Sequence, residues 1–217
     1  MNLNIASSNF EDNSSLNGGA IYFDKIVNDK EQDHIIEISD TKFINNKAEY
    51  FGGGIYSDFV GMKSSKLNNV EFSTNHAYAG GAVYTERNKE NTLFNVVDKE
   101  NVIFINNISE SHGDDYASGP SLINLMTEVD KITITSGQLY PLRFNIVDEY
   151  SQLIYDYSKY YSNIIINAEY NSENENIDDD DDSYNNENKI IGNICNFSKG
   201  ILTLYFIFKF YYYYYFN

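Results

Sequence analysis

A short phrase recurs three times in the first half of this chain and then begins a fourth time. The complete copies read FEDNSSLNGGAIY at 10–22, FINNKAEYFGGGIY at 43–56 and FSTNHAYAGGAVY at 72–84. The fourth copy opens as FINN at 104–107 and ends as GDDY at 113–116. The phenylalanines that open the copies are 33, 29 and 32 residues apart. Such self-similarity indicates a repeat architecture, in which each unit buries its apolar face against its neighbours.

The intervals between the phenylalanines predict strands. No apolar stripe recurs at helical spacing, and short apolar runs alternate with Asn, Gly and Ser. Three such runs fit each interval, and we expect them at 20–22, 54–56 and 82–84, at 34–39, 62–67 and 93–97, and at 41–44, 69–73 and 101–105. Three strands per turn that stack from turn to turn predict an all-β chain, with a right-handed parallel β-helix of about four coils at residues 1–125.

The repeated residues have structural roles in such a coil. Paired glycines permit positive φ where the chain bends into a strand, and they let adjacent coils approach closely. An asparagine three residues after each phenylalanine tolerates the left-handed region and can bond its equivalents as a ladder. The structural positions are Phe10, Asn13, Gly18, Gly19, Phe43, Asn46, Gly52, Gly53, Phe72, Asn75, Gly80, Gly81, Phe104 and Asn107.

Tyrosines alternate with aliphatic residues in the strand that follows the glycines. Alternation places each tyrosine on the opposite face of the strand from the aliphatic residue before it. If the aliphatic residues point inward, the tyrosines form an outer stripe that can pack against sugar rings or a protein partner. The alternative, with equal weight, is that the tyrosines pack beneath long loops, because the sequence leaves open which face of the strand points inward. The candidate binding stripe is Tyr22, Tyr56 and Tyr84.

The Phe-x-x-Asn … Gly-Gly-Ala-Ile phrase resembles the repeat of polymorphic outer-membrane-protein-like and pectin-lyase-like right-handed β-helix proteins. This resemblance covers about residues 1–125 and implies the β-helix fold. Solenoids of this kind include adhesins, passenger domains and polysaccharide-degrading enzymes, so the resemblance leaves the function open. Residues 131–156 resemble the start of an immunoglobulin-like or invasin-type sandwich, on Ser136-Gly137 and Asp148-Glu149-Tyr150-Ser151.

The decayed fourth copy carries the one acidic cluster that suggests catalysis. By alignment with the other copies, Asp115 takes the place of an inward aliphatic residue, where an unpaired carboxylate is costly, so we expect the ladder to end at about residue 116. The run His112-Gly113-Asp114-Asp115 has the paired carboxylates of sugar hydrolysis, but no second acidic site or well-placed base accompanies it. We predict no catalytic residue, no metal site and no cofactor. His34, His76 and Cys195 also lack ligand spacing.

Residues 126–208 are expected to form a small β-sandwich-like region. The acidic block 171–189 lies inside it and is interpreted as a disordered, solvated loop, because it lacks the spaced aspartates and glycine of a calcium loop. The tyrosine-rich tail, 209–217, matches no structural pattern and is interpreted as aberrant. The apolar run that leads into this tail is shorter than a membrane-spanning helix requires.

Composition excludes some partners. The net charge of −17 argues against nucleic acid and anionic membrane surfaces. No signal peptide opens the chain, which we attribute to truncation. We expect an extracellular or cell-surface location. The parent protein is a candidate for a membrane-anchored protein. The favoured function is a non-catalytic adhesin or binding module for a glycan or surface protein, with contacts at the stripe and at loops 23–33 and 85–91. The alternatives are a pectin-lyase-like enzyme and a truncated product without function.

Overall fold

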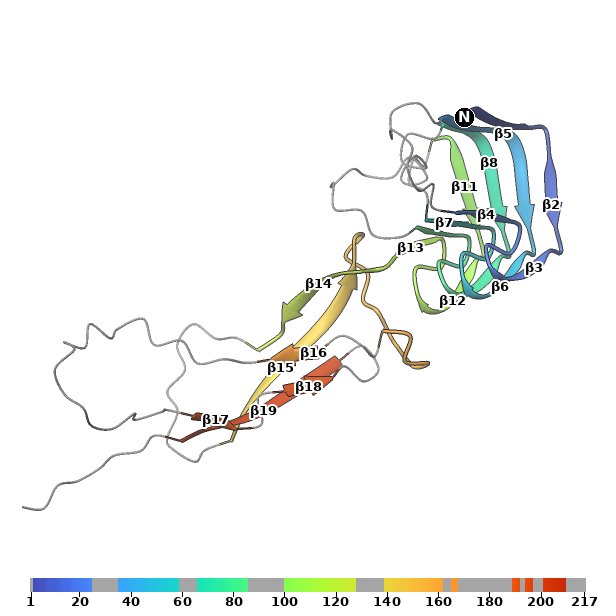
Figure 1. The fold of residues 1–217 in the computed structure, drawn as a ribbon. Helices are drawn as coiled ribbons and strands as arrows, with labels where there is room; N and C mark the ends of the chain where they lie inside the picture. Colours follow the sequence, from blue (N-terminus) through green and yellow to red (C-terminus); the bar gives the residue numbers. More distant parts are fainter. Residues whose placement is uncertain are drawn as a thin grey trace, which may run out of the picture. The chain divides into compact units, whose positions relative to one another are not determined.

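The computed structural model describes residues 2–24, 35–58, 66–85, 100–127, 139–161, 165–167, 189–191, 194–196 and 201–209. These residues form strands and irregular segments, and none of them is helical (Figure 1). Among them, no helix is long and apolar enough to cross a membrane. The chain divides into two compact units. Unit 1 joins Met1–Leu122 to Ile146–Tyr155, and unit 2 joins Ile123–Asn145 to Asp156–Asn217.

Unit 1 is a parallel β-helix of four coils and three sheets (Figure 1). The first sheet contains β1 (Asn2–Ala6), β2 (Asn9–Glu11), β5 (Ile35–Ile44), β8 (Lys66–Ser73) and β11 (Val102–Ile105). The second contains β3 (Ser14–Asn17), β6 (Lys47–Phe51), β9 (His76–Ala79) and β12 (Ile108–His112). The third contains β4 (Ile21–Phe23), β7 (Ile55–Ser57), β10 (Val83–Thr85) and β13 (Tyr116–Ser118). The strands pair in parallel, which confirms the predicted fold class.

The strands of each coil differ in part from those predicted. The runs expected at 34–39 and 41–44 form the single strand β5, which passes through a positive φ at Asp40. The second sheet was missed, because its short strands carry small, polar and aromatic residues instead of an aliphatic run. Ala48, Ala77 and Ala79 are among its buried residues. The strand expected at 93–97 lies outside the described residues, as do residues 62–65.

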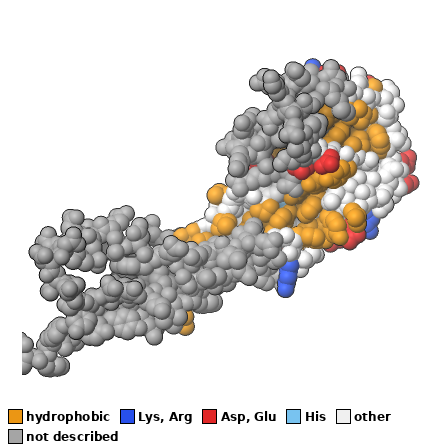
Figure 2. All heavy atoms as spheres, viewed as in Figure 1, with side chains coloured by type: hydrophobic (Ala, Val, Ile, Leu, Met, Phe, Trp, Pro, Cys, Tyr) orange, Lys and Arg blue, Asp and Glu red, His pale blue; other side chains and the backbone are white. Residues whose placement is uncertain are grey.

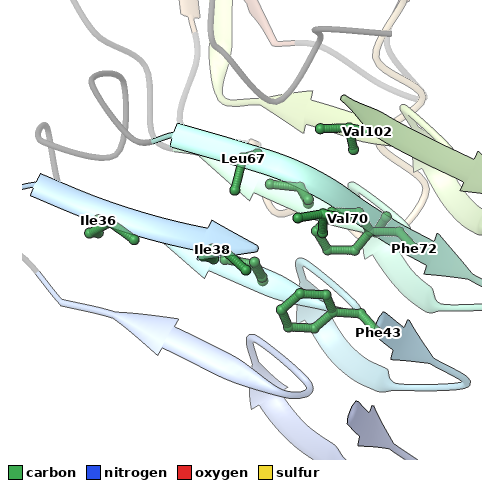
Figure 3. Packing of buried hydrophobic residues seen from close by; sticks show 10 residues of the cluster. Ile36, Ile38, Phe43, Leu67, Val70, Phe72 and Val102 are labelled. Carbon is green, nitrogen blue, oxygen red and sulfur yellow. The ribbon is translucent and has the colours of Figure 1, made fainter. Parts of the chain in front are cut away.

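The interior of unit 1 holds stacked apolar side chains (Figure 3). The phenylalanines that open the repeats lie one above another, with ring centroids 5.0, 4.7 and 5.4 Å apart from the first coil to the fourth. Each such ring removes a large apolar area from water, and offset stacking adds to the stabilisation. Most of the labelled core residues are aliphatic, and they belong to β5, β8 and β11.

The register corrects the expected position of Asp115. Val83 pairs with Tyr116, so the row of Ile21, Ile55 and Val83 continues with a tyrosine. A register shift in β12 explains the error, since one extra residue lies between Ser109 and His112 relative to β9. A bulge of this kind moves every later residue of the coil by one position. The fourth coil therefore continues to the end of β13 at Ser118.

The remaining strands form two small groups, and most of their residues belong to unit 2. One sheet has the order β14 (Pro120–Leu125), β15 (Leu139–Asp148), β19 (Ile201–Lys209) and β17 (Lys189–Ile191), and β15 and β19 are antiparallel. A separate antiparallel pair joins β16 (Ile165–Asn167) to β18 (Ile194–Asn196). The immunoglobulin-like resemblance stays a prediction. Ser136-Gly137, residues 171–188 of the acidic block and the tail from residue 210 lie outside the described residues.

Candidate functional site

The three tyrosines of the candidate stripe lie in one row. Tyr22 pairs in register with Tyr56, and Tyr56 with Tyr84. Their rings stack at centroid distances of 4.9 and 5.7 Å. The neighbouring aliphatic residues belong to the interior core, whereas Tyr56 and Tyr84 belong to a separate apolar cluster on the other face of the third sheet. The row is therefore on the outside of the coils.

Exposure falls steeply along this row. Tyr22 is 48% exposed, Tyr56 is 7% exposed and Tyr84 is 2% exposed. Phe51 stacks on Tyr84 at 4.5 Å and meets Tyr78 edge-on at 6.3 Å. Hydrophobic side chains gather over the coils on the face shown in Figure 2. Of the three tyrosines, only Tyr22 has much of its surface exposed to solvent. Tyr56 stacks on Tyr22, and Tyr84 stacks on the opposite face of Tyr56.

The repeated asparagines form a hydrogen-bonded ladder at one corner of the coils. Asn13 donates to Asn46 Oδ1 through its backbone N–H at 3.1 Å and through Nδ2 at 2.8 Å. Asn46 donates in the same way to Asn75, and Asn75 to Asn107, each at 3.0 Å. The side chains of the later three are at most 5% exposed. Every rung thus satisfies a backbone donor, which is buried in the rungs from Asn46 and Asn75, and the direction of donation is the same throughout.

The left-handed backbone falls one residue before each of these asparagines. Positive φ occurs at Asp12, Asn45, Thr74 and Asn106, with values between 51 and 57°. The asparagine of the ladder thus contributes its side chain, while its predecessor makes the bend. This separation differs from the expectation that the ladder residue itself adopts the left-handed region.

The two glycines of each pair have different tasks. The first has positive φ, from 61 to 68° across the four coils, as at Gly52. The second packs against the next coil, and a Cβ atom on Gly53 would overlap the carbonyl oxygen of Gly81 and lie 2.7 Å from the backbone N of His76. Only glycine leaves room for the following coil at this second position.

The acidic pair of the decayed copy closes the C-terminal edge of the solenoid. Asp114 aligns with the second glycine, and it can carry a side chain because the described chain places no fifth coil beyond it. Its Oδ1 accepts hydrogen bonds from the backbone N–H and the Oγ of Ser109 at 2.8 and 3.0 Å. Asp115 Oδ1 accepts from Asn107 Nδ2 at 3.2 Å, in the place of a further asparagine. These contacts give the carboxylates a structural role.

A turn from beyond the solenoid closes the third sheet at the same end. Asp148 is 2% exposed, and its Oδ2 accepts from the backbone N–H of Ser118 at 3.1 Å. Gln152 Nε2 donates to the carbonyl of Tyr116 at 2.9 Å and to Asp148 Oδ2 at 3.0 Å. The two side chains therefore supply the acceptor and donor that a fifth strand would offer. Sequence reasoning missed this cap, whose only signal was the turn at 148–151.

Tyr150 covers the end of the interior stack from this turn. Its ring meets that of Tyr116 edge-on at 4.9 Å and packs against the core cluster. Burial raises the pKa of Tyr150 above its ordinary value of 10.0, while a hydrogen bond with Thr85 lowers it in part. The phenol is neutral at physiological pH, as a packed cap requires.

Within the described part of the chain, the remaining polar side chains form no recognised reaction centre. His112 is buried, with Nδ1 2.9 Å from Ser111 Oγ and Nε2 3.0 Å from the carbonyl of Ser118. The part of the chain that the structure describes contains no group of three metal-ligating side chains. Of the expected contact loops, residues 25–33 and 86–91 lie outside the described residues. The geometry stacks the equivalent tyrosines, asparagines and glycines of successive coils in three separate rows. It places Asp114 and Asp115 at the C-terminal edge of the solenoid.

One family model matches the chain, that of the Chlamydia polymorphic membrane protein repeat, at residues 7–24 and 40–58. The two matched segments run from the first and second phenylalanine turns through the glycine pairs. Comparison with curated proteins and with solved structures found no match. The first two coils of this solenoid are thus similar to a repeat of Chlamydia polymorphic membrane proteins.

Proposed function

We propose that the chain is a non-catalytic binding module of a cell-surface protein, which contacts a glycan or a surface protein through the exposed end of its tyrosine row. The match to a repeat of polymorphic membrane proteins supports a surface location. The observation that carries the binding proposal is the exposed ring of Tyr22, held on a stacked and buried tyrosine.

The physical argument rests on rigidity. A ring that projects alone loses rotamer freedom when it binds, whereas Tyr22 lies 4.9 Å from the ring of Tyr56, with an angle of 6° between the ring planes. Tyr56 is in turn stacked on Tyr84. A pre-ordered aromatic face of this kind packs against the apolar face of a sugar ring or against a partner side chain at low entropic cost.

The test is binding of the labelled full chain to a glycan array and to cells, compared between the wild type and Tyr22→Ala. Tyr157→Ala is the matched control, because Tyr157 is 60% exposed and belongs to unit 2. We expect Tyr22→Ala to weaken binding about tenfold, the effect of losing one aromatic contact, and we expect the control to bind like the wild type. Equal binding by all three proteins would overturn the assignment of the surface.

The same preparations test the enzymatic alternative. Release of reducing or unsaturated sugar from acidic polysaccharides would show catalysis. We expect none, because the carboxylates of Asp114 and Asp115 accept hydrogen bonds that close the solenoid edge. Sugar release that is lost in Asp115→Asn would refute the non-catalytic proposal.

A further inference from the structure

The first sheet ends at β11 without the cap that covers the third sheet (Figure 1). After the fourth coil the chain continues into β14, which pairs with β15 in a different sheet. The turn that returns to the solenoid bonds to Tyr116 and Ser118 of the third sheet. Within the described part of the chain, β11 pairs with β8 alone, so one side of this strand is a sheet edge.

The backbone groups on this edge follow from the repeat. In β8, the N–H of Val70 donates to a carbonyl of the fourth coil at 3.1 Å. The carbonyl of Phe72 accepts from Asn107 Nδ2, also at 3.1 Å. Val102 and Phe104 pair in register with Val70 and Phe72. Because equivalent residues of successive coils point the same way, Val102 and Phe104 direct their N–H and C=O groups away from β8, at the edge.

The outward side chains of β11 differ from those of the inner strands. Ile103 is 51% exposed and pairs in register with Glu71, which pairs with Lys42. Glu71 and Lys42 form an ion pair at 2.8 Å. Ile105 is 41% exposed and lies two residues later, on the same outward face. Native edge strands are protected by charged side chains, whereas here the charges lie on the inner strands and β11 has none.

We propose that β11 is a dimerisation edge, at which a second copy of this chain adds its own β11 in antiparallel orientation. Two identical edges meet across a twofold axis, which makes the paired strands antiparallel. An axis at Ile103 sets Val102 opposite Phe104 of the second copy, and these two residues exchange N–H···O bonds through their edge-directed groups. Ile103 then lies opposite its own equivalent, in the close pair without hydrogen bonds, and packs against it.

The charge of the chain favours this strand for contact between two copies. Each copy has a net charge of −17, so an acidic surface would repel its equivalent in a dimer. β11 has no charged residue, and the carboxylate beside it in the outward row, that of Glu71, is paired with Lys42. Pairing of β11 with β11 therefore buries apolar side chains without setting like charges opposite each other. Salt screens the repulsion between the remaining charges, so association should strengthen as ionic strength rises.

The test is sedimentation equilibrium of the full chain. We expect the wild type to form a reversible dimer whose Kd falls as salt is added, and we expect Ile103→Lys to raise this Kd at least about tenfold. Lysine occupies the equivalent outward position in the second coil, at Lys42, so the substitution is compatible with the fold. Ile108→Lys is the matched control, because Ile108 is 57% exposed and lies on β12. We expect this control to dimerise like the wild type.

Disulfide cross-linking tests the register. In a Cys195→Ser background, which removes the only cysteine, Ile103→Cys should form a covalent dimer under mild oxidation. The Cα atoms of a close antiparallel pair lie about 4.5 Å apart, within the reach of a disulfide. Lys42→Cys, in the same row on an inner strand, should stay monomeric. A wild type that is monomeric up to about 0.1 mM, equal weakening by both lysine variants, or equal cross-linking by both cysteine variants would overturn the proposal.

Discussion

The buried asparagine ladder offers the sharpest test of what holds the coils together. Asn75 is 0% exposed and takes part in four side-chain hydrogen bonds. Its Oδ1 accepts from the N–H and Nδ2 of Asn46, and its Nδ2 donates to the carbonyl of Phe43 and to Asn107 Oδ1. Asn75→Leu keeps a similar volume and removes all four.

The expected loss of unfolding free energy follows from the polar groups that the substitution leaves buried without a hydrogen-bond partner. The backbone N–H of Asn46 and the carbonyl of Phe43 lose their side-chain partner, and each unsatisfied group costs about 1–3 kcal/mol. The sum is about 2–6 kcal/mol, against a typical total of about 5–15 kcal/mol for a domain. Asn13→Leu is the control, since Asn13 is exposed and Asn46 Oδ1 keeps a second donor. It should cost less than about 1 kcal/mol.

Urea unfolding followed by circular dichroism measures both variants. We expect the midpoint to fall strongly for Asn75→Leu and hardly at all for Asn13→Leu, with unchanged slopes. Losses of unfolding free energy that agree within about 1 kcal/mol would refute the argument, because the smallest expected cost of Asn75→Leu, about 2 kcal/mol, exceeds the largest expected cost of Asn13→Leu by that amount. The ladder would then be a consequence of coil stacking and not one of its causes.

Three further predictions concern the glycine pairs and the cap. Gly53→Ala should lower the unfolding free energy by about 1–3 kcal/mol through backbone overlap, while Asp114→Ala should show no such steric effect. Above pH 10, the stability advantage of the wild type over Tyr150→Phe should shrink by up to about 1.4 kcal/mol per pH unit in urea titrations, because the raised pKa makes the folded state hold the phenolic proton more tightly. Asp148→Ala should accelerate hydrogen exchange at the Ser118 amide, and an unchanged rate would contradict its capping role.

The spacing of the repeat predicted which residues become neighbours, because equivalent residues of successive coils stack in a solenoid. Phe43 lies opposite Phe72 in the paired strands, as the interval of 29 residues requires. The second sheet could not be found in the same way. Its strands have no aliphatic run, and their place is fixed by the neighbouring coils instead of by local pattern.

The exposure of the tyrosine row could not be predicted from the sequence either. Alternation placed the tyrosines opposite the aliphatic residues, but it carries no information on what covers the outer face. Phe51 stacks on Tyr84 from the end of a strand that was not predicted. The number of exposed rings therefore depended on a tertiary contact, and the predicted stripe of three is one exposed ring on two buried ones.

The end of the solenoid shows why an edge is harder to read than a repeat. Inside the stack each residue is constrained by a copy of itself, so identity along the sequence reports contact. At the edge the missing copy is replaced by chemically different groups, here carboxylates that accept from the donors that the last coil leaves. Asp148 lies 30 residues after the amide that it accepts from. Alignment with the earlier copies has no equivalent for such a residue. For the same reason, Asp114 and Asp115 looked in the sequence like the loss of the repeat pattern, and only their hydrogen-bond donors reveal their role at the edge.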